Sequence, residues 1–113
     1  MVNDRKQSVR RALHSLGQDR FVAFIRAVRR EQSPHAVTMM NEALDSGDDA
    51  EETLLAGDEY GYILDVRRVG PRRYRIDFGF LAGPTAGDGG EWEVQYDEEK
   101  RVVSAESDSF WIS

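Results

Sequence analysis

The chain of 113 residues contains no cysteine, only two histidines and no long apolar run. The absence of cysteine excludes disulfide bonds, thiolate nucleophiles and cysteine-ligated metal sites. No stretch approaches the roughly 18 apolar residues of a membrane span, and the first residues lack the apolar run of a secretory signal. We therefore expect a cytoplasmic protein that does not enter a membrane. The composition, 40% hydrophobic and 32% charged, is typical of a single globular domain over residues 1–113.

Motifs that carry chemistry are equally scarce. The two histidines, His14 and His35, are too few nitrogen ligands for a zinc site in a chain without cysteine. The acidic run from Asp45 to Glu52 lacks the spacing of a calcium-binding loop. The glycines of 83–90 are not followed by the helix that a phosphate-binding loop requires. We therefore expect no catalytic residue, no metal and no cofactor.

The first half of the sequence has the period of an α-helix. Apolar residues recur at spacings of three and four in the segments 9–16, 21–28 and 37–44. The pair Ser33-Pro34 is typical of a helix start, because serine caps open N–H groups and proline is tolerated at the first helical position. Asp49 and Glu52 have the spacing of a capping box and predict one or two further helical turns.

From Tyr60 onward the apolar period changes to two. Apolar and polar residues alternate in 60–66, 74–80 and 92–96, as in strands that are covered on one face. The fourth segment, from Arg101 to about Ile112, is less regular. A bulge near 107–109 would let both of its apolar groups face inward, one with Val103, Ala105 and Trp111 and the other with Val102, Phe110 and Ile112. These strands predict an antiparallel meander.

The change of period predicts an α+β fold. We expect two to three N-terminal helices, in a helical part of about 5–56, packed on one face of a four-stranded antiparallel meander sheet over about 58–113. The nine residues 82–90, rich in glycine, are expected to form the longest loop of the sheet. Favourable charge pairs define a register for the strands. The expected opposite pairs are Leu64–Ile76, Asp65–Arg75 and Phe80–Trp92. The last of these also places Arg75 beside Asp97, so we expect Arg75 to have a structural role.

Charge is strongly segregated along the chain. The net charge is −6, yet residues 1–30 contain eight basic and two acidic residues. Residues 31–66 contain ten acidic and no basic residues, and 67–75 contain five arginines. This layout and the tyrosines of the sheet indicate three candidate binding regions. They are an arginine cluster (Arg67, Arg68, Arg72, Arg73), an acidic partner surface (Asp48, Asp49, Glu51, Glu52, Glu91, Glu93) and a pocket between helices and sheet (Tyr60, Tyr62, Trp92).

The lack of reactive groups, together with the segregated charge, favours a non-enzymatic protein-interaction module, adaptor-like or immunity-like by analogy of size and acidity. The expected partner is another protein, and the alternative is a homo-oligomer formed through the sheet. An alternative is a small-molecule-binding or enzymatic helix-covered cone with a pocket between helices and sheet. A further alternative is nucleic-acid binding through the arginine cluster 67–73, which the negative net charge disfavours.

Overall fold

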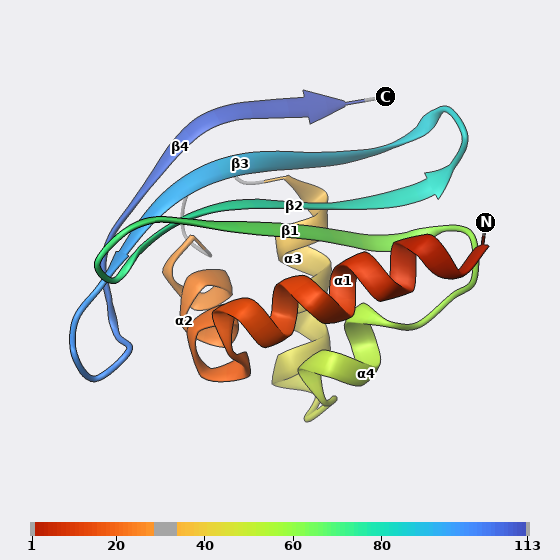
Figure 1. Ribbon diagram of the computed structural model, residues 1–113. Coiled ribbons are helices and arrows are strands. Elements are labelled where there is room, and N and C mark those ends of the chain that lie inside the picture. Colours follow the sequence, from red (N-terminus) through yellow and green to blue (C-terminus); the bar gives the residue numbers. More distant parts are fainter. Residues whose placement is uncertain (1, 29–33, 113) are drawn as a thin grey trace.

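Four helices precede four strands in the computed structural model, which describes residues 2–28 and 34–112. The strands form one antiparallel sheet in the order β1-β2-β3-β4, and the helices lie on one of its faces (Figure 1). The predicted α+β fold is therefore confirmed. The helices are α1 (Val2–Leu16), α2 (Gln18–Ala27), α3 (His35–Asp45) and α4 (Ala50–Leu54), and the strands are β1 (Gly61–Gly70), β2 (Arg73–Gly83), β3 (Ala86–Tyr96) and β4 (Val102–Ile112).

Local sequence signals explain where the helices begin and end. Gly17 separates α1 from α2 with a φ of 92°, a left-handed conformation that glycine adopts at little cost. Asp49 caps α4, because its side chain accepts a hydrogen bond from the backbone N–H of Glu52 at 3.0 Å. The predicted capping box is thus confirmed in part, and α4 is a helix of five residues. The predicted cap Ser33 lies outside the described residues.

The N-terminus of α3 is capped by the sheet. No cap side chain precedes the helix, because Pro34 occupies the N-cap position. Instead the carboxylate of Asp88, on β3, accepts hydrogen bonds from the backbone N–H groups of His35 at 2.5 Å and Ala36 at 3.1 Å. A carboxylate at this end satisfies open N–H groups and interacts favourably with the helix dipole. This contact ties α3 to the sheet across 53 residues of sequence.

Aromatic rings fill the core between helices and sheet. Phe24 on α2 lies with its ring centroid 5.1 Å from that of Trp92 and 6.3 Å from that of Phe78, both edge-on. Phe21, which is also on α2, has its ring centroid 5.6 Å from that of Phe78. These four side chains are almost entirely buried, and each such ring contributes about 1.5–3 kcal/mol on burial. The apolar face of α2 therefore packs against the apolar face of the sheet, as the apolar spacing of the sequence predicts.

The strand register differs from the one that charge pairing indicates. Leu64 lies opposite Phe78, not Ile76, and Asp65 consequently lies opposite Asp77. The β1–β2 turn consists of Pro71 and Arg72, and the register shifts between Arg68 and Gly70, where an extra residue is accommodated. Because the error is two residues, each side chain still faces the predicted side of the sheet.

The glycine-rich segment forms strand, which corrects the prediction of a long loop at 82–90. Gly83 pairs with Ala86 across a turn of only two residues, and Gly87 to Gly90 belong to β3. Phe80 accordingly lies opposite Asp88, and Trp92 opposite Ile76. The glycines are accounted for by a close approach, since a Cβ on Gly79 or Gly89 would overlap the ring of Trp111.

Candidate functional site: the outer face and open edge of the sheet

The face of the sheet that points away from the helices carries a row of three carboxylates. Asp65 lies opposite Asp77, and Asp77 lies opposite Glu91, so the row crosses β1, β2 and β3. Burial raises the pKa of Asp77, the indole of Trp111 lowers it through a hydrogen bond, and Glu91 and Asp65 raise it further. Oδ1 of Asp77 is buried and has no hydrogen-bond partner among the described residues. Like charges directly opposite each other destabilise a sheet.

The next row along the strands is organised by Arg75. Its guanidinium donates to Glu91, at 2.9 Å from Nε, and to Asp108 on β4. It also lies 3.6 Å from Glu93. Three carboxylates thus surround one arginine, and the hydrogen bond to Glu91 is the main cause that raises the pKa of Arg75. The expectation that Arg75 has a structural role gains support from this geometry, although its partners are not the expected ones.

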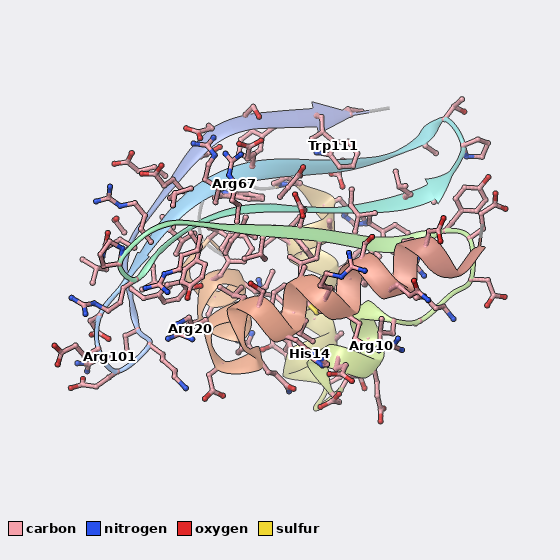
Figure 2. All side chains as sticks on the ribbon, viewed as in Figure 1. Arg10, His14, Arg20, Arg67, Arg101 and Trp111 are labelled. Carbon is pink, nitrogen blue, oxygen red and sulfur yellow. The ribbon has the colours of Figure 1, made fainter. Side chains whose placement is uncertain are left out.

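The four residues of the predicted arginine cluster are exposed at the β1–β2 end of the sheet. Arg73 donates to Oε1 of Gln95 at 3.0 Å, and Arg68 donates to the carbonyl of Gly70 at 3.3 Å. Arg72 occupies the turn with a φ of 55°. Arg67 lies on the outer face, opposite Arg75 (Figure 2). Their proposed binding role stays a prediction.

The predicted acidic partner surface is divided between two sides of the molecule. Glu91 and Glu93 lie on the outer face of the sheet, whereas the segment 48–52 forms the start of α4 on the helical side. Within that segment Asp49 is the N-cap, and Glu51 lies 3.7 Å from His14. The structure therefore provides two separate acidic regions, and one partner surface does not include both.

The tyrosine and tryptophan residues predicted to line a pocket lie against the core. The ring of Tyr62 stacks on that of Phe78 with centroids 5.6 Å apart, and Trp92 is 1% exposed. Burial, followed by the charge of Glu42, raises the pKa of Tyr62 to about 12. Tyr60 is half-buried just before β1.

The two edge strands of the sheet differ in how they are protected. At β1, the guanidinium of Arg5 donates to the carbonyl of Tyr62 at 2.6 Å and to that of Ala56 at 3.1 Å, and α1 packs along the strand. At β4 the side chains are mostly exposed, including Val103 at 66%, Phe110 at 50% and Ile112 at 87%. Exposed apolar side chains on an unpaired edge are unusual in a folded domain.

The sequence predicted the bulge in β4 correctly but not the orientation of its apolar residues. The register shifts between Ser107 and Ser109, as expected, and again between Val102 and Ser104. Trp111 was expected to face inward, yet it lies on the outer face over Gly79 and Gly89 (Figure 2). The sequence feature that indicates this position of Trp111 is the presence of glycine at 79 in β2 and at 89 in β3.

Comparison with protein-family models, with curated proteins and with solved structures finds no match for this chain. Within residues 2–28 and 34–112, no helix is long and apolar enough to cross a membrane. The same residues contain no group of three or more histidine or acidic side chains placed to hold a metal ion.

Proposed function

We propose that this protein is a non-enzymatic interaction module that binds an extended, basic segment of a partner protein along the open edge of β4. The observation that carries this proposal is the exposure of Phe110 and Ile112 on an edge strand, which among residues 2–28 and 34–112 pairs with β3 alone. An edge strand presents unpaired N–H and C=O groups to which another strand adds. Proteins protect such edges with lysine, proline or bulges. Residues 102–112 contain neither lysine, arginine nor proline, and their protection is limited to the two register shifts and the carboxylates of Glu106 and Asp108.

The chemistry of the expected partner follows from the two faces of β4. The inner side carries Ala105 and Phe110, which lie opposite Val94 and Gly90 of β3. The outer side carries Glu106, next to Glu93. Side chains of an added strand alternate between these faces. The best complement is a segment that alternates apolar residues with lysine or arginine.

Charge argues for a basic partner rather than a second copy of this chain. Each copy carries a net charge of −6, and two β4 strands paired antiparallel about Ser107 would place Glu106 beside Asp108 of the other copy. Like charges in directly opposite positions are unfavourable. A basic segment gains from the same carboxylates. A cytoplasmic location for this encounter stays a prediction.

The test uses a synthetic peptide of alternating lysine and valine, with an otherwise identical peptide that has glutamate in place of lysine. We expect the lysine peptide to protect amides of β4 from hydrogen exchange, and to bind more weakly at high salt. Phe110→Lys should lower the affinity about tenfold, equivalent to ~1.4 kcal/mol. The matched control is Val69→Lys, which adds the same charge at another exposed apolar residue, 40% exposed, on β1.

Three results would contradict the proposal. One is equal binding of the lysine and glutamate peptides, and another is an unchanged affinity in Phe110→Lys. The third is a concentration-dependent dimer in sedimentation experiments that Ile112→Lys abolishes, because the edge would then belong to a second copy of the chain.

A further inference from the structure

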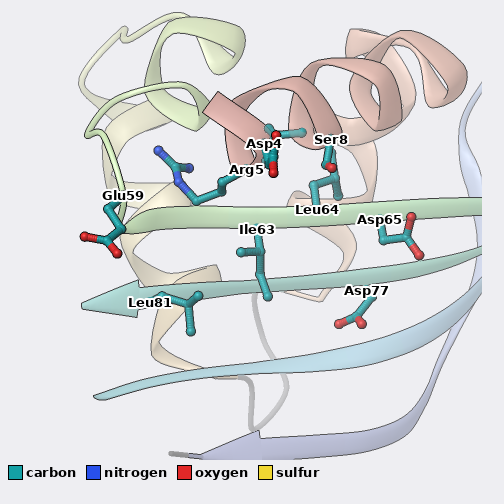
Figure 3. Close-up of a pocket in the computed structure, with 10 residues that line it drawn as sticks. Asp4, Arg5, Ser8, Glu59, Ile63, Leu64, Asp65, Asp77 and Leu81 are labelled. Carbon is teal, nitrogen blue, oxygen red and sulfur yellow. The ribbon is translucent and has the colours of Figure 1, made fainter. Parts of the chain in front are cut away.

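A hollow of about 440 Å³ lies between α1 and β1, at the edge of the sheet opposite β4. Asp4, Arg5 and Ser8 line it from α1, and Ile63 and Leu81 belong to β1 and β2 (Figure 3). Its volume falls in the range of small-molecule sites, which are about 300–1,000 Å³. It is separate from the β4 edge, since β1 and β4 are the two outer strands of the sheet.

The lining of this hollow divides into an apolar part and an acidic part. Ile63, Leu64 and Leu81, together with Val9 of α1, form the apolar part. The acidic part includes Asp65 and Asp77. A second hollow of about 140 Å³, which extends across the outer face toward Arg67 and Glu91, shares these two aspartates. The aspartate pair therefore lies where the two hollows meet.

Three arginines line the two hollows, and two of them, Arg5 and Arg75, are engaged elsewhere. Arg67 lines the second hollow beside the aspartate pair, without an ion pair to either aspartate within 4.0 Å among the described residues. The guanidinium of Arg5 donates to backbone carbonyls, of which the shortest contact is 2.6 Å to Tyr62. Arg75 is bound by Glu91 and Asp108. In the described part of the chain, no ion pair reaches Asp65 or Asp77 within 4.0 Å. The two aspartates of the pair therefore lie outside the ion pairs formed by the described residues.

Two features of the aspartate pair destabilise the fold when no ligand is bound. Asp65 and Asp77 lie directly opposite each other, which is repulsive when both are charged. Oδ1 of Asp77 is buried without a hydrogen-bond partner, and an unsatisfied buried acceptor costs about 1–3 kcal/mol. A positively charged group with several N–H donors, placed between the two carboxylates, relieves both deficits.

We propose that this hollow binds a small organic cation, with an ammonium or guanidinium group at Asp65 and Asp77 and an apolar body on Ile63 and Leu81. The charged head and the apolar body match the two parts of the lining. The site does not depend on the proposed function of the β4 edge, because it uses the other outer strand.

The test is a titration with phenethylammonium and with agmatine, followed by NMR shifts of the Ile63 and Leu81 methyl groups. The uncharged analogue 2-phenylethanol has the same aromatic body and serves as the ligand control. For ligands of this size we expect a Kd on the order of 1 mM. Asp65→Asn and Asp77→Asn keep the side-chain shape, and each should weaken binding about tenfold. Glu98→Gln, which removes one charge from the exposed β3–β4 turn, should change the Kd less than about twofold.

Three results would overturn the proposal of a cation site. Equal shifts with 2-phenylethanol would show that only the apolar part is used. An unchanged Kd in both asparagine variants would remove the aspartate pair from the site, as would the absence of binding by either cation at about 10 mM. Ile112→Lys distinguishes this site from the proposed function, since it should weaken the peptide and leave the binding of phenethylammonium unchanged.

Discussion

Replacement of Arg5 by alanine should destabilise the protein far more than its place near the N-terminus indicates. The guanidinium joins α1 to the chain between α4 and β1, because it donates to the carbonyls of Tyr62 at 2.6 Å and Ala56 at 3.1 Å. It also lies 3.3 Å from the carbonyls of Gly57 and Asp58. One side chain thus satisfies several carbonyls at the start of the sheet.

The expected magnitude follows from these contacts. A hydrogen bond from a charged donor contributes about 1.5–3 kcal/mol when well formed and shielded. Only the bond to Tyr62 is partly buried, and those to Ala56, Gly57 and Asp58 are exposed. We therefore expect Arg5→Ala to lower the free energy of unfolding by about 2–3 kcal/mol, which for a domain of this size corresponds to a decrease in Tm of about 8–12 °C.

The assay is thermal and urea unfolding followed by circular dichroism, with Arg10→Ala as the matched control. Arg10 is exposed on the same helix, so the change in helix propensity and in charge is the same. Arg10→Ala should lie within about 0.5 kcal/mol of the parent. Arg5→Lys should recover part of the loss, because an ammonium reaches fewer carbonyls than the planar guanidinium. The reasoning is refuted if Arg5→Ala and Arg10→Ala unfold within about 2 °C of each other.

Two further predictions concern the outer face. Burial raises the pKa of Asp77 in the folded protein, so this group favours folding at low pH and its contribution is lost as pH rises through the folded pKa. Asp77→Asn should therefore raise the Tm near pH 8 and change it much less near pH 3.5, which lies below both the ordinary and the raised pKa of this carboxyl. A lower Tm at pH 8 would contradict this. Gly89→Ala should cost about 1–3 kcal/mol in urea unfolding, because its Cβ would overlap Trp111 and lie 2.7 Å from the carbonyl oxygen of Phe78. Gly83→Ala, which meets nothing within 4 Å, is the control and should be near neutral.

The fold could be predicted from the sequence because burial on one face leaves a direct record in the spacing of apolar residues. The stripe that contains Phe21 and Phe24, and the alternation that begins at Tyr60, required only the periods of helix and strand. The register could not be predicted in the same way. A shift of two residues keeps every side chain on its face, so the choice between Ile76 and Phe78 as the partner of Leu64 left the pattern unchanged.

The candidate sites were less predictable, because they depend on contacts between distant segments. Charge pairing favoured Asp65 beside Arg75, yet Arg75 is bound by residues of β3 and β4, and Asp65 faces another carboxylate. A like-charged pair of this kind gives no favourable signal to a search for complementary charges. The role of Arg5 was missed for a related reason, since its partners are backbone carbonyls and carry no side-chain identity.

The cap that Asp88 provides for α3 makes the stability of this helix conditional on the sheet. During synthesis on a ribosome, residues 35–45 emerge well before residue 88, so the first turn of α3 lacks its stabilising carboxylate until β3 has been made. The helix and the strand should then gain and lose order together, as one cooperative unit rather than as independent pieces. A chain truncated before β3 would leave the start of α3 frayed, even though every residue of the helix itself is present.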